Sequence, residues 1–346
     1  MCFVESLIQI LMIQIMNKFF LIGFIVCFIS CGTGTDEQNK RQKTRDNVVN
    51  AKELTYTIDC DEVLIGSIAQ PYIFGKYLMI VDYKSMDKLI HVFDKKNFKW
   101  LYSFGDMGQG PNEISSIGTI AWNNDTHEIY VMDNAQRKLL SYNADSLSVN
   151  HQHLPSLKLK LSGTTIPDDL YYINDTLSYG SFVKLTESSF MLTVGKWNMD
   201  NGNIDFVDYV HPADKKKRIA FSVSTKHDRI VECNRRYDLM SLYDTDLKLL
   251  CNIYGPNWDE DGDRKEHFSN VAICGDKIVA SYTGEDWQRN DGAKQLHIFT
   301  IDGDYIKTIY LDRKINRLCY DEDNNRLIIN FDSDIQFGYL NLNQFL

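Results

Sequence analysis

The sequence predicts an all-β fold, a six-bladed β-propeller made of four-stranded antiparallel blades. Two observations predict it. A segment of similar pattern occurs six times along the 346 residues, at a spacing of about 40 to 60 residues, which is the length of one propeller blade. Within each copy, apolar residues alternate with polar or small residues, as in half-buried strands, and no stretch has the pattern of a long amphipathic helix.

The six copies share one order of elements. A turn of Gly, Asp, Asn or His precedes an aliphatic strand, and a polar linker leads to a second alternating strand and usually to a third. The copies begin at Gly75, His127, Glu187, His227, Gly275 and Asn324. Their second strands are expected near Ile80, Tyr130, Met191, Ile230, Ile278 and Leu327. The third copy is the weakest, and the pattern over 171–210 is irregular.

The two ends of the repeat region are predicted to close the ring. The last copy runs out of chain after about three strands, whereas a blade has four. One unassigned strand, residues 53–59, precedes the first copy. Because an open ring would expose sheet edges, we expect residues 53–59 to form the outer strand of the last blade. The propeller is therefore assigned to residues 51–346.

The N-terminal segment is predicted to be a signal peptide. Met16 is the expected true start, and a lysine near it is followed by an apolar run over 19–29. This run has the length of a signal-peptide core and is too short to span a bilayer. We expect residues 1–30 to be removed. The alternative is an uncleaved membrane anchor over 7–29.

Cys31 is the predicted lipidation site. The small residue Ser30 precedes it, as in a bacterial lipobox, where the cysteine thiol is acylated and becomes the first mature residue. Residues 32–47 are polar, charged and without aromatic side chains, so they cannot bury enough surface to become ordered. Residues 31–50 are therefore predicted to be the lipidated cysteine and a flexible tether to a membrane.

Charge and cysteine content exclude several classes of protein. The formal net charge of −10 and the lack of a basic patch argue against a nucleic-acid partner. The basic run at 215–218 is expected to be a solvated loop. The cysteines after the lipobox are widely spaced and include no CxxC, which favours small core residues over a zinc site, with one disulfide left open. They are Cys60, Cys233, Cys251, Cys274 and Cys319.

A glycine-rich stretch over 104–114 marks the junction between two blades. Its notable residues are Gly105, Gly108, Gly110, Pro111 and Glu113. It has neither the spacing of a P-loop nor that of a dinucleotide fingerprint, and no helix follows it. We therefore expect it to turn the chain from an outer strand to the next inner strand. A partial copy at 253–263 again follows an outer strand.

The same stretch carries a family resemblance. GDMGQGPNEI resembles the G-x-G-P-x-E-[FI] signature of TolB-like, or BF3164-like, six-bladed propeller lipoproteins of Bacteroidetes, which are similar to NHL-repeat propellers. Residues 117–143 also resemble an NHL repeat, and the likeness covers 53–346. The resemblance implies a lipoprotein of the outer membrane, at its periplasmic or surface face, with a structural role for the signature loop. It implies no particular reaction.

The sequence contains no recognisable catalytic motif and predicts no cofactor. HExxH, GxSxG and SxxK are all missing. His151 and His153 have the spacing of two ligands on one strand face, but no third ligand is apparent. Residues 259–263 are similar to a calcium loop, although the glycine comes fourth instead of sixth. Calcium or another divalent metal is therefore the alternative, and residues 321–325 are expected to be a hairpin turn.

Four residues are candidates for ligand contact or modification. Trp258 and Trp287 lie in polar loops, where an aromatic ring can stack on a sugar, although most propeller aromatics pack between blades. Ser146 and Thr176 lie in DSL and DTL, which resemble the Bacteroidetes O-glycosylation sequence.

These observations favour a non-enzymatic, envelope-anchored propeller that binds a protein or a glycan through one rim. The alternative is a metal-dependent hydrolase resembling gluconolactonases, with its site in the central channel. Three or more carboxylates converging on the axis would distinguish it. A purely structural part of an envelope complex is the third possibility.

Overall fold

The computed structural model describes residues 39–345, except 186–188, 214–216, 260–263 and 289–291. The chain divides into two units, Met1–Lys40 and Arg41–Leu346, and the second contains the propeller. The predicted signal peptide and Cys31 lie outside the described residues.

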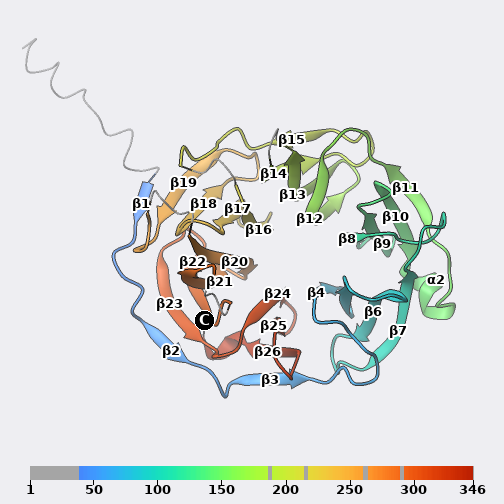
Figure 1. Cartoon of the computed structure of the whole chain (residues 1–346), viewed down its shortest axis with the longest axis horizontal. Helices are drawn as coiled ribbons and strands as arrows, with labels where there is room; N and C mark the ends of the chain where they lie inside the picture. The colour runs from blue at the N-terminus through green and yellow to red at the C-terminus, as the bar shows by residue number, and fades with distance from the viewer. Residues whose placement is uncertain (1–38, 186–188, 214–216, 260–263, 289–291, 346) are drawn as a thin grey trace, which may run out of the picture. The chain divides into compact units, whose positions relative to one another are not determined.

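Six antiparallel sheets stand around a common axis and form the predicted propeller (Figure 1). Blade 1 contains β4 (Ala69–Phe74), β5 (Tyr77–Asp82), β6 (Lys88–Asp94) and β7 (Trp100–Asp106). Blade 2 contains β8 (Ile117–Asn123), β9 (Glu128–Asp133), β10 (Lys138–Asn143), the short helix α2 (Ala144–Val149) and β11 (Ser156–Lys160). Blade 3 contains β12 (Ile166–Asn174), β13 (Leu177–Leu185), β14 (Phe190–Trp197) and β15 (Ile204–Phe206).

The other three blades have the same order. Blade 4 contains β16 (Ile219–Ser224), β17 (Arg229–Asn234), β18 (Leu239–Tyr243) and β19 (Leu249–Tyr254). Blade 5 contains β20 (Lys265–Cys274), β21 (Lys277–Asp286), β22 (Gln295–Thr300) and β23 (Tyr305–Tyr310). Blade 6 contains β24 (Ile315–Asp321), β25 (Arg326–Phe331) and β26 (Phe337–Asn341), followed by the 3-10 turn η1 (Leu342–Gln344).

The ring closes as the sequence predicts. The outer strand of blade 6 is β3 (Thr55–Ile58), which pairs antiparallel with β26. Leu340 lies opposite Thr55 and Phe337 lies opposite Ile58. The blue β3 beside the red β26 in Figure 1 shows this joining of the two ends of the propeller. The last blade therefore has four strands, and its outer edge is covered.

Apolar side chains from neighbouring blades pack together in the same way around the ring. Val81 of blade 1 and Val131 of blade 2 belong to one buried cluster. Ile80 and Ile328 belong to another, which joins blade 1 to blade 6. These residues lie on second strands, which explains why the second strand of a copy has the strongest apolar pattern.

The irregular third copy is where the assignment of strands from sequence is wrong. Met191 lies on β14, the third strand of blade 3, and the second strand is β13. The first strand, β12, contains a β-bulge and two adjacent aspartates, so its alternation is broken. The other five marker residues lie on second strands, as predicted.

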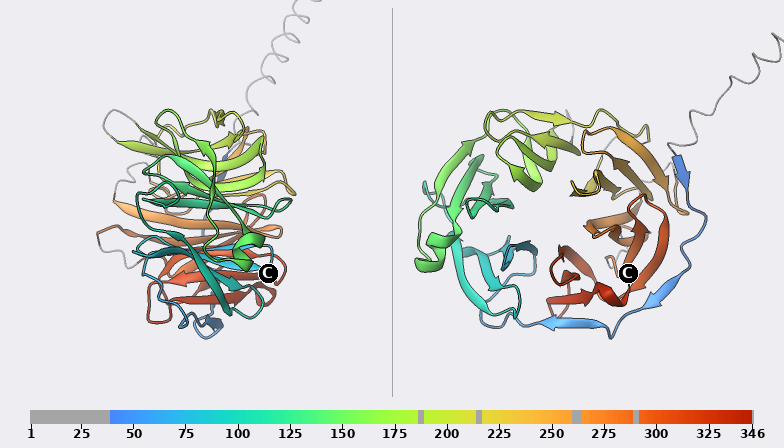
Figure 2. Two further views of the ribbon diagram at one scale, coloured as in Figure 1. Left: turned by 90° about the vertical axis from the view of Figure 1, so that its right-hand side faces the viewer. Right: turned by 180° about the vertical axis from the view of Figure 1, so that it is seen from behind.

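The chain before β3 differs from the predicted tether. From Arg41 onward it follows the outside of blades 4 and 5, where the blue segment of Figure 2 runs beside the orange and red blades. Strand β1 (Asn39–Arg41) ends at the start of this segment. The backbone N–H of Gln42 donates to the carbonyl of Tyr254. Strand β2 (Val48–Asn50) then pairs parallel with β23. Backbone pairing orders this polar segment without the apolar side chains that the prediction required.

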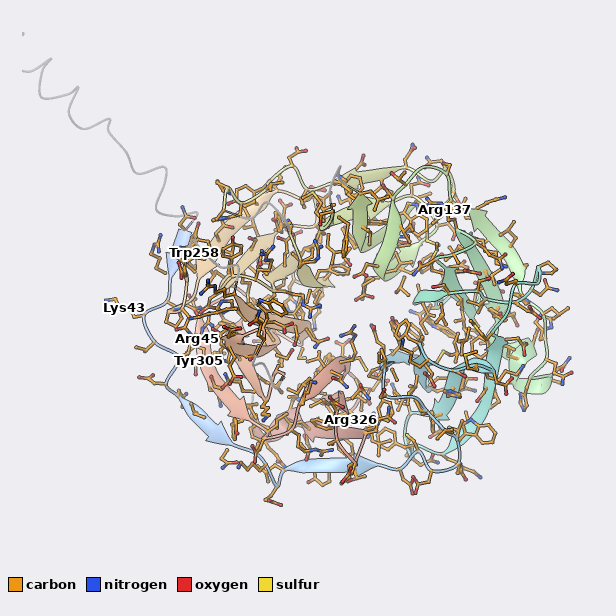
Figure 3. The ribbon with its side chains drawn as sticks, in the orientation of Figure 1. Lys43, Arg45, Arg137, Trp258, Tyr305 and Arg326 are labelled. Carbon is orange, nitrogen blue, oxygen red and sulfur yellow. The ribbon has the colours of Figure 1, made fainter. Side chains whose placement is uncertain are left out.

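Arg45 fastens this outer segment to blades 4 and 5. Its Nη1 donates to Asp238 Oδ1 at 2.7 Å and lies 3.3 Å from His297 Nδ1. The side chains of Arg45 and Asp238 are 6% and 0% exposed. The guanidinium also lies 5.3 Å from the ring centres of Tyr282 and Phe299, within the range of cation–π attraction. In Figure 3, Arg45 lies against blade 5 near Tyr305, whereas Lys43 lies outside the ring.

We predict that Arg45→Met destabilises the propeller by about 3 kcal/mol, because it leaves the Asp238 carboxylate buried without its cation. Chemical denaturation of the variant and the wild type measures the difference. Lys43→Met is the matched control, since Lys43 is an exposed cation two residues away. Equal midpoints for wild type and Arg45→Met would show that the contact contributes nothing.

Candidate functional site

The inner strands of the six blades enclose a central channel with a cavity of about 700 Å³. Every blade contributes lining residues, from β4, β8, β12, β16, β20 and β24. The lining combines apolar residues such as Ile73, Leu170 and Val271 with a somewhat larger share of polar surface. The two ends differ in chemistry. A cavity of this size and mixed lining is typical of a site for a small ligand or a short chain.

One end of the channel is shaped by β-bulges. Four inner strands change register near their start: β8 between Ile117 and Ile120, β12 between Pro167 and Asp169, β20 on both sides of Phe268, and β24 between Ile315 and Arg317. Successive residues of a regular strand point to opposite sides, and a bulge re-aims them. We call this region, with Thr119, Asp168, Asp169, Asn270 and Arg317, the bulged end; of these five residues, Asp169 lines the cavity itself.

The bulge in β12 gives the bulged end two adjacent carboxylates. Asp169 lies opposite Ser181, and Asp168 is the extra residue of the bulge. Thr119 of blade 2 donates to Asp169 Oδ1 at 3.4 Å, and Ser181 donates to Asp168 Oδ2 at 3.4 Å. The two carboxylates therefore have separate, weak hydroxyl donors.

The electrostatics of the pair follow from confinement. Burial, and next the negative charge of Asp168, raise the pKa of Asp169 to about 6, against the opposing effect of Arg317. Asp168 has an exposed side chain. Burial by the surrounding protein nevertheless raises the pKa of its carboxyl group, and the positive charge of Arg317 opposes this rise. Asp169 therefore changes charge near neutral pH.

Two tyrosines of blade 1 adjoin the carboxylates. The hydroxyl of Tyr83 donates to Gln70 Oε1 at 3.2 Å. Burial raises the pKa of Tyr83 to about 12, and burial followed by the proximity of Tyr83 raises the pKa of Tyr72 well above its usual value. Both phenols therefore stay protonated and can act as hydrogen-bond donors at neutral pH.

An aromatic ladder runs along the wall from Tyr72 toward the opposite end of the channel. Its four rings are stacked in sequence: Tyr72 on Phe74 at 5.7 Å, Phe74 on Trp122 at 6.0 Å, and Trp122 on His127 at 5.8 Å between ring centres. Blade 3 presents Tyr171, whose side chain is 45% exposed. We call the part of the channel with Phe74, Trp122 and Tyr171 the aromatic end. It offers flat apolar surface beside the polar groups of the inner-strand turns.

The turn of blade 6 fixes the rim of the aromatic end. Lys95 of blade 1 forms ion pairs with Asp321 at 3.3 Å and Asp323 at 2.5 Å. Arg326 donates to Asp321 at 2.8 Å and to the carbonyl of Lys95 at 2.6 Å. The predicted turn at 321–325 is present. It joins blade 6 to blade 1, with Glu322 and Asp323 lining the cavity.

The signature loop lies outside the channel, between β7 and β8, and is held by its own residues. Glu113 accepts a hydrogen bond from the N–H of Gly110 at 2.8 Å. Lys138 donates to the carbonyls of Pro111 and Glu113, both at 3.0 Å. A Cβ at Gly108 would clash with Glu113 Oε2. Gly105 has a φ of +80°. These contacts explain the glycines of the loop by its backbone conformation and close packing.

The tryptophans singled out from sequence lie away from the channel lining. Trp258 packs against the rings of His211, Tyr237 and Tyr254 at 5.1, 5.4 and 4.8 Å. Trp287 is 59% exposed in the connection between β21 and β22. Neither residue contributes to the cavity.

The two candidate glycosylation sites have different accessibility. Ser146 is half-buried in α2, where its N–H donates to Asn143 Oδ1 at 2.9 Å. Thr176 is exposed in the turn between β12 and β13, and its hydroxyl lies 2.9 Å from Asn174 Oδ1. Of the two residues, Thr176 is therefore the more accessible to solvent.

The histidine pair does not converge. His151 stacks on Tyr102 at 4.7 Å and its Nδ1 lies 2.8 Å from the carbonyl of Leu147. His153 is exposed. In the part of the chain that the structure describes, no three His, Cys, Asp or Glu side chains form a group that could hold a metal ion. Of the calcium-like loop, Asp259 is described and 260–263 lie outside the described residues.

The five cysteines of the described ranges are free thiols, so the disulfide left open by the sequence is not formed. Cys233, Cys251 and Cys274 are buried, as expected for small core residues, and Cys60 and Cys319 are half-buried.

The channel residues were missed because they precede the strands that define the repeat. Phe74 is the last residue of β4, Trp122 is the last but one of β8, and Tyr171 lies in the second half of β12, each before the second strand of its blade. Aligning the copies one strand earlier would have shown aromatic residues on three inner strands. The adjacent aspartates at 168–169 were visible as the point where strand alternation fails.

Comparison with known proteins agrees with this architecture. Residues 59–278, more than half of the chain, match the model of the family DUF5128, described as a 6-bladed beta-propeller. The chain belongs to this family. No curated protein matches it.

Solved structures share the fold at low sequence identity. A member of the DUF4221 family from Bacteroides vulgatus has 11% identity and a TM-score of 0.57, over 83% of this chain and 94% of its own. A putative exported protein from Bacteroides fragilis has 13% identity and a TM-score of 0.53, over 84% and 88%. A gluconolactonase from Xanthomonas campestris has 9% identity and a TM-score of 0.53, over 88% and 96%. These likenesses establish the propeller fold.

No helix within the described ranges is long and apolar enough to cross a membrane.

We predict that Asp169→Asn changes the pH dependence of stability. A raised pKa means that the folded state binds the proton more tightly than the unfolded state, so this group stabilises the fold below about pH 4 and the effect is lost as pH rises through about 6. The melting temperature of Asp169→Asn relative to wild type should therefore rise between pH 4 and pH 7. The exposed Asp334→Asn is the control, and parallel profiles for all three proteins would contradict the prediction.

Proposed function

We propose that the chain is a lipid-anchored protein of the cell envelope that binds a glycan in the central channel of its propeller. The observation that carries the proposal is that three rings of the aromatic ladder, Tyr72, Phe74 and Trp122, line a cavity of about 700 Å³. The proposed anchor is Cys31, and the proposed location is the outer membrane, in keeping with the resemblance to TolB-like propeller lipoproteins of Bacteroidetes. A structural neighbour described as a putative exported protein supports export.

A glycan fits the two kinds of surface in the channel. The faces of sugar rings are apolar and stack on aromatic side chains, and the hydroxyl groups need hydrogen-bond partners. Tyr171 supplies an exposed ring at the aromatic end, and Phe74 and Trp122 add apolar surface to the lining. Tyr83, Gln70 and the carboxylate of Asp169 supply donors and acceptors farther in. A protein partner usually needs about 800 Å² of its own surface buried, which a narrow concave site does not provide.

The arrangement favours binding over metal-dependent hydrolysis. The carboxylates of the channel form two separate sets, Asp168 with Asp169 at the bulged end and Glu322 with Asp323 at the aromatic end. Within the described ranges they do not form a group of three that could hold a metal. Calcium or another divalent metal stays an alternative to be tested. Ligand binding distinguishes the proposal from the third possibility, a purely structural subunit.

We expect Tyr171→Ala to weaken glycan binding about tenfold, a loss of about 1.4 kcal/mol, because it removes an exposed stacking surface without opening the core. The full chain, purified in detergent, is first screened by thermal shift against peptidoglycan fragments, host glycans and calcium, since a bound ligand raises the apparent stability. Isothermal titration then gives the affinities of the variants for the best ligand.

Trp287→Ala is the matched control, because Trp287 is an exposed aromatic residue that does not line the channel. Its affinity should equal that of the wild type. The opposite result, loss with Trp287→Ala and none with Tyr171→Ala, would place the glycan on the outer loops and contradict the proposal.

The anchor has its own test. Cys31→Ala should move the protein from the membrane fraction to the soluble fraction, because the acylated thiol is lost. Cys60→Ala should stay with the membrane, since Cys60 belongs to the ring. Fractionation followed by immunoblotting measures both. Membrane retention of Cys31→Ala would contradict lipid attachment at this residue.

A further inference from the structure

We propose that the bulged end of the channel is a binding site for a zwitterion, a ligand with an ammonium group and a carboxylate group. In this site the ammonium group lies at Asp168 and Asp169, and the carboxylate lies at Arg317. The inference goes beyond glycan binding, because it concerns charged groups at the end of the cavity away from Phe74 and Trp122.

The three charged residues approach the channel from opposite sides. Asp168 and Asp169 belong to blade 3 and Arg317 belongs to blade 6, and in a ring of six blades the third and the sixth face each other. Arg317 lowers the pKa of Tyr83 on blade 1 as well as those of the two aspartates on blade 3. Arg317 follows the start of β24, and Asp168 and Asp169 follow the start of β12, so the three residues lie at the same end of the inner strands.

These opposite charges do not neutralise one another. Arg317 Nη1 donates to the carbonyl of its neighbour Asn316 at 3.0 Å. Asp168 and Asp169 accept only from hydroxyl and backbone groups, and the described residues contain no ion pair between either aspartate and Arg317. Another nearby cation, Arg235, is paired with Glu266 at 2.6 Å. Charges of opposite sign that lie at the same end of the channel without an ion pair between them are complementary to a ligand that carries both signs.

The local backbone holds the charges in this arrangement. The bulge in β12 adds Asp168 beside Asp169, and the bulge in β24 precedes Arg317. Asn270 of blade 5 donates to the carbonyl of Asn316 at 3.1 Å, which fixes the backbone next to Arg317. Bulges break the regular ladder and are found near functional sites because they re-aim side chains. The bulges in β12 and β24 therefore lie next to the three charged residues of the proposed site.

A bound metal is a weaker explanation of these residues. Calcium needs about six to eight oxygen ligands, and the cationic Arg317 opposes a second cation beside the carboxylates. A ligand that carries only a negative charge would be repelled by the two carboxylates. A zwitterion satisfies the positive and the negative groups together, and Tyr72 and Tyr83 can donate hydrogen bonds to it.

A series of ω-amino acids tests the site directly. Glycine, β-alanine, γ-aminobutyrate and 6-aminohexanoate carry the same two charges at increasing separation. Isothermal titration of the full chain in detergent should give one preferred length, bound at least about tenfold more tightly than butylamine or butyrate, which carry one charge each. Equal binding of zwitterions and singly charged probes, or no binding of any member, would overturn the proposal.

Variants identify the residues. Asp169→Asn and Arg317→Met should each weaken the preferred zwitterion about tenfold or more, whereas Arg317→Lys should keep part of the affinity because it keeps the charge. Melting curves show whether each variant is folded. The exposed Asp334→Asn is the control and should bind normally. Unchanged affinity in folded Asp169→Asn and Arg317→Met would place the zwitterion elsewhere and overturn the assignment.

The test is independent of the glycan. The ω-amino acids have no sugar ring, so Tyr171→Ala should leave their affinity unchanged. Loss of glycan binding with intact zwitterion binding, or the reverse, therefore separates the two proposals. If both sites bind, a sugar that carries an amino-acid substituent is the ligand class to test next, because the cavity extends from the aromatic end to Asp169.

Discussion

The pairing of β3 with β26 is the interaction on which the channel depends. All six inner strands line the cavity, so the site is complete only when blade 6 has its outer strand and the ring is closed. Side chains also connect blade 6 to blade 1. Lys95 forms an ion pair with Asp321, and Arg326 donates a hydrogen bond to the carbonyl of Lys95. A strand near the N-terminus of the second unit thus determines whether residues far along the chain face one another.

The segment before β3 adds a second constraint. It continues around blades 4 and 5, and Arg45 fixes it through a buried ion pair with Asp238. This segment would connect the propeller to a lipid on Cys31. Along the chain, the Arg45 contact and β2 come before the closing strand β3, so a pulling force on the lipid would act on them first. In the proposed lipoprotein, the outer segment would therefore be loaded before the closing strand.

The sequence predicted the ring, its closure and its blade count, because strand alternation and repeat length are local properties. It did not predict which side chains face the axis. The bulge at Asp168 depends on how β12 pairs with β13, and the Arg45 contact joins residues separated by 193 positions. Trp287 was chosen because its loop is polar, yet the channel aromatics, such as Phe74, lie on strands. Strand register and long-range contacts determine the site, and neither can be read from amino-acid composition or from the length of the repeat.

The central claim is that ligands bind inside the channel. Hydrogen–deuterium exchange of the full chain, with and without the glycan that gives the largest thermal shift, tests it most directly because it locates the contact without any substitution. The account predicts slower exchange in β4, β8 and β12, whose residues form the aromatic ladder and the bulged end. Slower exchange confined to the outer loops, such as the connection that carries Trp287, with no change in the inner strands, would contradict it.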